Sequence, residues 1–349
     1  MNPNHETHPT PAREPTALRL RLGTRASALA RWQADWVRAR LTEFGFTVEL
    51  VFLSTQGDVS ARPLGAIGGS GVFTKEIQRA LLGGEIDLAV HSLKDLPTEP
   101  VAGLTLTAVP PRESTADVLV SASGRLGRSQ CELPLGPEST QQDITCPQNS
   151  AGNAINALPA GALIGTGSVR RRAQLLHFRS DLQVLDIRGN VDTRLRKLDE
   201  GQYDAVILAE AGLRRLGLTE RITQVIPRQV MLPAVGQGAL GVETRADAAA
   251  VVQAVARLDH PETRAAVMAE RALLAALRGG CLAPVAAWGR VADGNLLLDA
   301  VVLDGCGSRR LWAARRGAPA AAESLGRETA EELLAAGAAE LIAAARGPR

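Results

Sequence analysis

The chain has 349 residues, of which 45% are hydrophobic and 3% aromatic, enough for two or three domains with largely aliphatic cores. The 39 Lys and Arg nearly balance 37 Asp and Glu, a net charge of +2, so no overall field favours nucleic acid. The polar, proline-rich segment 1–16 lacks the apolar core of a signal peptide, and no apolar run reaches the about 18 residues of a membrane helix. We therefore expect a cytoplasmic protein with a disordered N-terminal tail.

The first predicted unit is a strand over 18–23, followed by the turn G-T-R-A-S and a helix. Apolar residues of this helix recur at intervals of three or four between Ala30 and Leu41, which is typical of an amphipathic helix. A second strand over 162–165 enters G-T-G-S and another helix. The same strand, turn and helix device therefore occurs twice.

A second pair of segments also repeats. A helix over 74–82 precedes G-E-I-D-L-A-V, and a helix over 191–199 precedes G-Q-Y-D-A-V-I-L. Short apolar strands that alternate with helices predict two related α/β domains with parallel sheets. Residues 122–157 are rich in Ser, Gln, Asn, Pro and Gly without periodicity, so we expect a mobile surface insertion there.

The pattern changes beyond residue 260. A helix between Ala266 and Leu277 is predicted to end at Gly279 and Gly280, because glycine tolerates the left-handed conformation of a helix C-cap. Three β segments follow, over 285–292, 296–303 and 308–314. Asp-Gly turns between them indicate a three-stranded meander. With an Ala-, Glu- and Leu-rich helix over about 320–345, they predict a third, α+β domain.

Positively charged side chains follow five predicted strand ends. In open α/β sheets, anions bind beyond the carboxyl ends of strands, where helix N-termini present free N–H groups. The polar residues at these places are Thr24, Arg25, Ser27, His91, Ser92, Lys94, Asp95, Ser168, Arg170, Arg171, Arg188, Asn190, Arg194, Arg214 and Arg215. Their recurrence favours a site for a ligand with several negative charges.

Each of these residues also has a simpler interpretation. Any single arginine is more often a solvated helix face, and His91 after an apolar strand is more often a satisfied core histidine. Asp95, before Leu96 and Pro97, could be a turn former, and Cys281 could be an inert buried thiol. The cysteines, Cys131, Cys146, Cys281 and Cys306, are too far apart for a C-x-x-C metal site. Together, a thiol after a helix and a set of guanidinium groups suggest a covalently held polyanion.

These residues fall within ordered blocks of sequence, and no single block would be specific. The blocks are G-T-R-A-S-A-L-A-R-W-Q, G-V-F-T-K-E-I, A-V-H-S-L-K-D-L-P-T, G-T-G-S-V-R-R-R-A-Q-L, R-G-N-V-D-T-R-L-R-K-L-D, L-P-A-V-G-Q-G-A-L-G-V-E and G-G-C-L-A-P-V. In this order, the chain resembles the porphobilinogen deaminase (hydroxymethylbilane synthase) family of tetrapyrrole biosynthesis. The resemblance runs from about Leu20 to the last helix, except near 122–157.

The resemblance implies a transferase that joins four porphobilinogen molecules head to tail, releases ammonia at each step and hydrolyses off hydroxymethylbilane. It implies a dipyrromethane cofactor joined by a thioether to Cys281, and a catalytic Asp95 that stabilises the cationic azafulvene. The implied cofactor-binding residues are Lys94, Ser168, Arg170, Arg171, Arg188 and Arg194. The implied substrate-binding residues are Arg25, Ser27, Arg188, Arg194 and Arg215.

The family fold implies two domains like those of periplasmic binding proteins, with the active cleft between them, and a smaller domain carrying the cysteine. The expected limits are 17–114 with 235–257, then 115–234, then 258–349. The family also implies a monomer, while the near-neutral charge, scarce aromatics and short apolar runs argue against nucleic acid and membrane as partners. Ser70 stands where the family usually has lysine. The alternative is a non-enzymatic two-domain binder of anions or solutes, which leaves Cys281 and Asp95 without a role.

Overall fold

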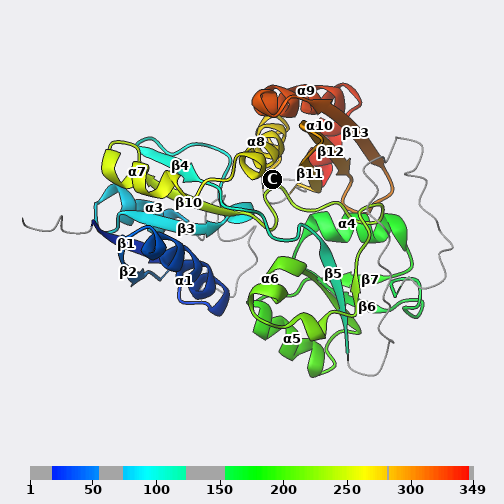
Figure 1. Ribbon diagram of the computed structural model, residues 1–349. Helices are drawn as coiled ribbons and strands as arrows, with labels where there is room; N and C mark the ends of the chain where they lie inside the picture. The colour runs from blue at the N-terminus through cyan, green and yellow to red at the C-terminus, as the bar shows by residue number, and fades with distance from the viewer. Residues whose placement is uncertain (1–17, 55–73, 123–153, 281–282, 346–349) are drawn as a thin grey trace, which may run out of the picture.

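The structure is a computed structural model that describes residues 18–54, 74–122, 154–280 and 283–345 (Figure 1). Ser70, Cys281 and most of the expected insertion over 122–157 lie outside the described residues. The described elements form two five-stranded sheets and one three-stranded sheet, with helices packed against each. No helix within the described ranges is both long and apolar enough to cross a membrane.

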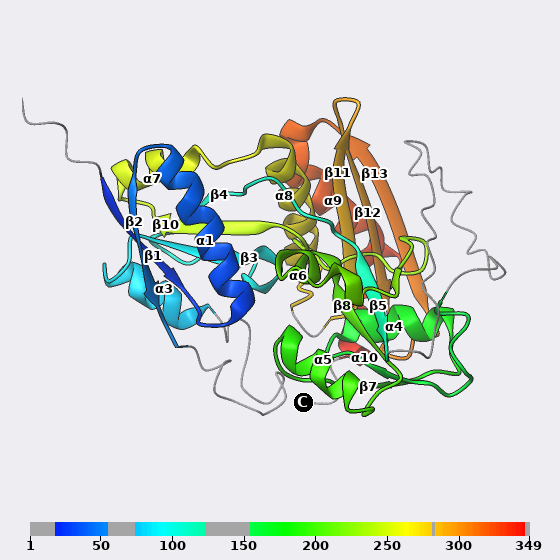
Figure 2. The same ribbon diagram turned by 60° about the horizontal axis from the view of Figure 1, so that its bottom comes forward.

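The first sheet has the strand order β2-β1-β3-β10-β4. Its strands are β1 (Arg19–Thr24), β2 (Thr47–Phe52), β3 (Leu88–Ser92), β4 (Leu104–Ala108) and β10 (Leu240–Arg245). The helices α1 (Ala28–Glu43) and α7 (Ala249–Ala256) pack on one face, and α3 (Lys75–Leu82) packs on the other. Figure 2 shows α1 lying across the sheet. Its buried stripe includes Ala34, Val37 and Leu41, as the helical periodicity predicts.

The second sheet has the strand order β7-β6-β8-β5-β9. Its strands are β5 (Asp117–Ser121), β6 (Leu163–Gly165), β7 (Gln183–Leu185), β8 (Ala205–Ala209) and β9 (Gln224–Val225). The helices are α4 (Val169–Phe178), α5 (Val191–Asp199) and α6 (Glu210–Arg215). Leu175 of α4 and Leu195 of α5 belong to two separate apolar clusters.

The two sheets share one topology. β1 in the first sheet and β6 in the second are each parallel to both of their neighbours. A strand from a distant part of the chain, β10 or β5, is inserted antiparallel in each sheet. The prediction of two related α/β domains is therefore confirmed, but the sheets are mixed rather than wholly parallel, because β10 and β5 are antiparallel to their neighbours. The antiparallel strands, β10 and β5, belong to the two segments along which the chain crosses between the sheets (Figure 1). Hydrophobic periodicity reports strand burial and carries no information on strand direction. The exact domain limits stay a prediction.

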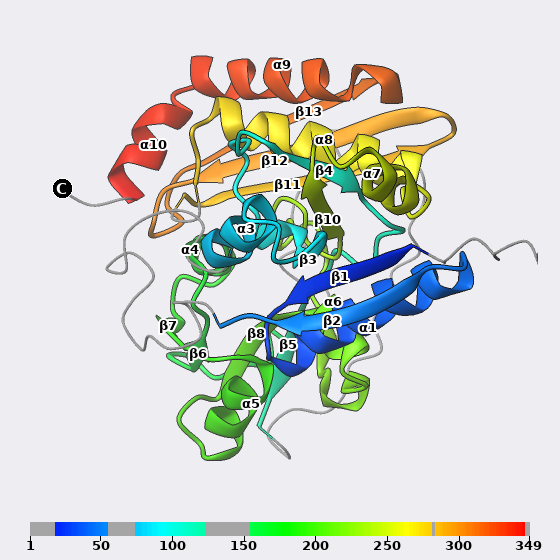
Figure 3. The same cartoon turned by 90° about the vertical axis from the view of Figure 1, so that its left-hand side faces the viewer.

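The third group of elements is α+β, as expected. The helix α8 (Pro261–Ala276) precedes the antiparallel meander β11 (Val285–Ala292), β12 (Asn295–Leu303) and β13 (Arg310–Gly317). Figure 3 shows α8 and α9 side by side against the meander. The single C-terminal helix predicted over 320–345 is two helices, α9 (Ala322–Ala335) and α10 (Ala338–Ala345). They are separated at Gly337, whose left-handed φ of 98° ends the first helix.

The meander joins the third domain to the second sheet. Ala286, Val301 and Leu303 pack with Ala173 of α4 and with Leu232. At the turn between β12 and β13, the Nδ1 of His177 donates a hydrogen bond of 2.8 Å to the carbonyl oxygen of Gly307. The third domain therefore packs against α4, whose first turn carries Arg170 and Arg171, two of the predicted binding arginines.

Gly307 allows the close contact between this turn and α4. It has a φ of 76°, and a Cβ there would lie 2.4 Å from the carbonyl oxygen of Ala173. Gly337 has a φ of 98°, and no atom of the described residues lies within 4 Å of where a Cβ would be. We predict that Gly337→Ala costs about 1–2 kcal/mol from left-handed strain, and that Gly307→Ala costs distinctly more because backbone atoms must also separate. Urea unfolding measures both, and equal losses would contradict this account.

Candidate active site

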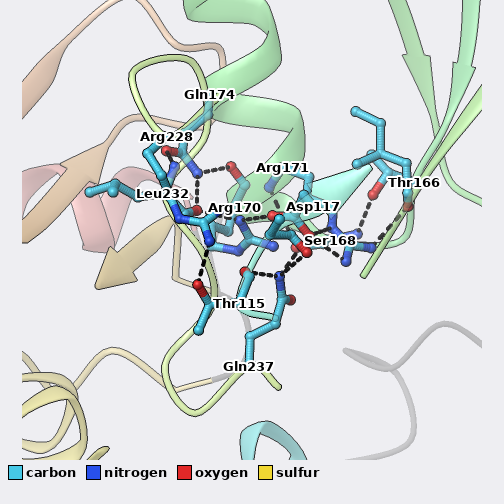
Figure 4. Close-up of polar contacts among 12 residues, drawn as sticks. Thr115, Asp117, Thr166, Ser168, Arg170, Arg171, Gln174, Arg228, Leu232 and Gln237 are labelled. Carbon is cyan, nitrogen blue, oxygen red and sulfur yellow. Dashed lines mark hydrogen bonds and ion pairs between the residues drawn. The ribbon is translucent and has the colours of Figure 1, made fainter. Parts of the chain in front are cut away.

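A buried carboxylate organises the start of α4. Asp117 begins β5 and is fully buried. Its Oδ1 accepts hydrogen bonds from the Nε of Arg171 at 3.0 Å and from its Nη2 at 2.7 Å, and its Oδ2 accepts from the Nη1 of Arg170 at 2.7 Å (Figure 4). Burial alone would raise the pKa of Asp117, but the two guanidinium groups hold it well below its ordinary value. The carboxylate is therefore charged and fixes both arginines.

The backbone around α4 completes this cluster. Ser168 is the N-cap of α4, and its hydroxyl accepts from the backbone N–H of Arg171 at 3.4 Å. Arg170 also donates to the carbonyl oxygen of Leu232 at 2.5 Å, and Arg171 donates to that of Ile207 at 2.9 Å. Capping thus stabilises the first turn of α4, and the orientation of this turn fixes where the side chains of Arg170 and Arg171 begin.

One pocket is lined by residues from both α/β domains and from the segment that joins β9 to β10. Its cationic side chains are Lys94, Arg171, Arg194 and Arg215. Its uncharged lining residues are Leu29, Ser92, Val191, Leu208, Ala209, Ala211, Gly212, Gly236, Gly238 and Ala239. The structure therefore brings together cations that follow four different predicted strand ends. In the sequence these residues lie far apart, between Lys94 and Arg215.

The pocket cations carry the electrostatic signature of an anion site. Lys94 is exposed to water, but the protein that surrounds it desolvates its ammonium group, and Arg171 repels it, which lowers its pKa to about 8. Desolvation, with repulsion from Arg171 and Arg188, lowers the pKa of Arg194 to about 10. Desolvation also lowers the pKa of Arg215 to about 10. Desolvation thus disfavours the charged form of all three groups, and repulsion from Arg171 adds to this at Lys94 and Arg194, so an anion that binds in the pocket stabilises these charges.

Asp95 ends a short 3-10 turn, Leu93–Asp95, that follows β3. The backbone N–H of Leu93 donates to the carbonyl oxygen of Ala239 at 3.0 Å. Gly236, with a φ of 71°, approaches this turn so closely that a Cβ on it would lie 3.2 Å from the backbone nitrogen of Lys94. Asp95 itself is exposed, and no residue in the described part of the chain donates a hydrogen bond to its carboxylate. Among the described residues, Asp95 therefore lacks the hydrogen bond from side chain to neighbouring backbone that is typical of a turn-forming aspartate.

The other predicted site residues have different surroundings. Ser27 is the N-cap of α1, and its hydroxyl accepts from the backbone N–H of Ala30 at 3.3 Å. Arg25 is half-buried between β1 and α1. Arg188 pairs with Asp186 at 2.8 Å. Arg170 is buried and is not among the pocket-lining residues. The binding roles of all these residues stay predictions.

His91 agrees with the simpler interpretation of a core histidine. It is 5% exposed, and its Nε2 lies 3.0 Å from the Oε2 of Glu243. Glu243 also accepts from the side-chain amide of Gln78. His91 is therefore a buried residue beside a carboxylate, although its Nε2 makes no hydrogen bond of good geometry to the described residues.

Sequence reasoning missed Asp117 and Gln237. The side-chain amide of Gln237 donates to the Oδ1 of Asp117 at 2.9 Å and to the carbonyl oxygen of Thr115 at 2.9 Å. The signal was an acidic residue that opens the apolar run A-D-V-L-V, since a buried carboxylate needs cationic or N–H partners. Its partners lie more than 50 residues away in the chain, where no local pattern identifies them.

Comparison with known proteins shows the family of this chain. Residues 20–253 match the family model described as the porphobilinogen deaminase, dipyromethane cofactor binding domain. Residues 264–335 match the porphobilinogen deaminase C-terminal domain. The chain belongs to the porphobilinogen deaminase family. The resemblance of the sequence blocks is thereby confirmed, and with it a transferase that uses a dipyrromethane cofactor.

Individual relatives match over nearly the whole chain. The porphobilinogen deaminase of Desulforudis audaxviator is 48% identical over 329 residues, which cover 93% of this chain and 97% of the relative. Those of Pelotomaculum thermopropionicum and Geobacter sulfurreducens are each 45% identical over 328 residues, covering 93% of this chain and 96% and 94% of the relatives. The family match is therefore not confined to one domain.

The pocket residues fit the cofactor of this family. Each pyrrole of the cofactor carries two carboxylates, and guanidinium groups bind carboxylates through paired N–H donors. The Nε of Arg215 is buried without a hydrogen-bond partner among the described residues. A donor of this kind, in a pocket that is also lined by Lys94, Arg171 and Arg194, suits a ligand with several carboxylates.

We predict that Lys94 titrates near pH 8 in protein made by cells that cannot supply porphobilinogen. Carboxylates that enter the pocket favour the charged ammonium, so the pKa of Lys94 should rise when the cofactor is loaded. The pH dependence of acylation at Lys94, followed by peptide mass, measures both values. Titration near the ordinary lysine value of about 10.4 in the unloaded protein would contradict the crowded-cation account.

Proposed function

We propose roles for individual residues of this chain in the reaction of its family. In that reaction, porphobilinogen units are joined head to tail with loss of ammonia, and hydroxymethylbilane is released. The observation that carries the proposal is the pocket in which Lys94, Arg171, Arg194 and Arg215 converge next to the turn of Asp95. Neither domain forms this arrangement alone, which favours a site in the cleft between them.

The cations bind and orient the carboxylates of the ligands. A charge-assisted hydrogen bond contributes about 1.5–3 kcal/mol when it is shielded from water. Arg171 needs no reorganisation to bind, because Asp117 already holds it through two of its nitrogens. When bound, the dipyrromethane supplies the pyrrole to which the first substrate unit is joined. A tethered acceptor makes each condensation effectively intramolecular.

Asp95 is the proposed catalytic residue. Its charge lies close enough to act on Lys94 and on Arg194, which line the pocket. Positive charge develops on the substrate as ammonia leaves, and a fixed carboxylate stabilises that charge. Removing one such electrostatic group commonly costs about 10²–10³ in rate. The carboxylate has no hydrogen-bond donor among the described residues and is thus available to the pyrrole N–H groups.

Further roles follow from the family resemblance. We assign thioether attachment of the cofactor to Cys281, cofactor binding also to Ser168 and Arg170, and substrate binding to Arg25 and Ser27. Arg188 and Arg194 serve both ligands. We also propose a monomeric, cytoplasmic enzyme with the three domain limits given above. A non-enzymatic anion binder is not favoured, because both family models that match describe the deaminase.

Replacing Asp95 separates catalysis from folding. Asp95→Asn keeps the size of the side chain but removes its charge, so kcat should fall at least about a hundredfold with a much smaller change in KM. The melting temperature should change little, since the carboxylate accepts no hydrogen bond from the described residues. Glu99→Gln removes a charge from an exposed position four residues further on and serves as the control. Near-normal turnover of Asp95→Asn would sink the catalytic assignment.

A further inference from the structure

One face of α8 contacts the turn that carries Asp95. Val267 and Arg271 are four residues apart on this helix and therefore lie on the same face. Val267 is fully buried and packs with Leu93 and Leu96. The Nη1 of Arg271 donates to the carbonyl oxygen of Leu96 at 3.0 Å, and its Nη2 donates to that of Pro97 at 2.7 Å. The helix thus holds the turn by an apolar contact and by two hydrogen bonds.

These two hydrogen bonds come directly after the proposed catalytic residue. The turn itself is closed by a single hydrogen bond of 3.2 Å from the N–H of Leu96 to the carbonyl oxygen of Leu93. Pro97 has no N–H to contribute. Two N–H groups of a planar guanidinium fix the orientation of the peptide units as well as their position. Arg271 therefore limits how far Asp95 can shift from its C-terminal side, as Ala239 does from the N-terminal side.

Arg271 is not placed there to form an ion pair. Among the described residues, no carboxylate oxygen lies within 4.0 Å of its guanidinium. Desolvation lowers the pKa of Arg271, and the more distant charge of Glu243 opposes this shift. Glu243 is itself occupied by His91 and Gln78. Burying a cation that donates only to carbonyl groups costs free energy. We attribute its presence here to the geometry that its two hydrogen bonds impose on the turn.

We propose that Arg271 is a positioning residue for the reaction, acting by fixing the turn that places Asp95 in the pocket. This inference rests on the catalytic role proposed above for Asp95. Displacing a catalytic group by about 1 Å can cost as much as about 10² in rate. The third domain thus contributes to catalysis through α8, although Arg271 does not line the pocket.

The same helix offers a matched control. Arg264 also lies on α8 and also donates to two carbonyl oxygens of the first domain, those of Leu106 at 3.3 Å and Thr107 at 2.8 Å. These carbonyl groups belong to β4 and not to the Asp95 turn itself, although the side chain of Leu106 packs against the cluster of Leu93 and Leu96. Arg264 differs from Arg271 in that it also pairs with Asp259 at 2.7 Å. Both Arg271→Met and Arg264→Met remove an interdomain clamp, so both should lower the melting temperature.

Turnover distinguishes the two variants. At a temperature where both are folded, kcat of Arg271→Met should fall about tenfold or more with little change in KM, while Arg264→Met keeps the kcat of the unaltered enzyme. Arg271→Lys, which can still bond one carbonyl, should recover part of the loss. If Arg271→Met does not fold, Arg271→Lys against Arg264→Lys gives the same comparison. Equal kcat in the two members of a pair overturns the proposal.

A double-mutant cycle tests whether Arg271 acts through Asp95. In an Asp95→Asn background, Arg271→Met should lower kcat little further, because the group that it positions has lost its charge. Fully additive losses overturn the positioning role. Loss of turnover in Asp95→Asn with normal kcat in Arg271→Met overturns only the role of Arg271. Near-normal turnover in Asp95→Asn overturns the proposed function, and the role of Arg271 with it.

Discussion

The site depends on the buried charge of Asp117. This carboxylate holds Arg170, Arg171 and Gln237 at once. Removing one partner from such a buried ion pair typically costs about 3–5 kcal/mol, because the remaining charge is left without compensation. Asp117 begins the strand that enters the second sheet, and Gln237 lies on the segment that returns to the first. One carboxylate therefore ties both crossings together at the start of α4, where the arginines proposed to bind the ligand leave the helix.

A second buried carboxylate joins the third domain to the same region. Glu270 of α8 is fully buried and accepts from both terminal nitrogens of Arg112, at 2.7 and 3.0 Å. It also accepts from the backbone N–H groups of Gly236 and Gly289, each at 2.7 Å. Four donors satisfy this carboxylate well, as a buried charge requires. Because Gly236 lies against the Asp95 turn, α8 supports the pocket through neighbouring residues.

The sequence predicted the elements of the fold better than their pairing. Periodicity located α1 and the meander strands, and the repeated turn devices indicated two related domains. Strand direction escaped it, since β5 and β10 are antiparallel insertions whose neighbours come from distant segments. The break at Gly337 escaped it too, because a single glycine within an Ala-rich helical pattern does not by itself require a left-handed φ.

The candidate site shows the same division. Lys94, Arg171, Arg194 and Arg215 were predicted from strand ends, where topology makes side chains converge. The residues that hold Arg171 and the Asp95 turn were not predicted. Asp117 and Arg271 act through partners 53 or more positions away, and such contacts are decided by tertiary packing. Identity of the family came from the ordered sequence blocks, which carry more information than any one residue.

The central claim is that this cationic pocket serves an enzyme whose primer is attached at Cys281. The intact mass of the denatured protein, purified from cells able to make porphobilinogen, tests it most directly. The account predicts a mass above the sequence value by two linked pyrroles, absent in Cys281→Ser and retained in Cys306→Ser, whose thiol is exposed on the meander turn. A bare chain, or an adduct that maps to Cys306, would contradict it.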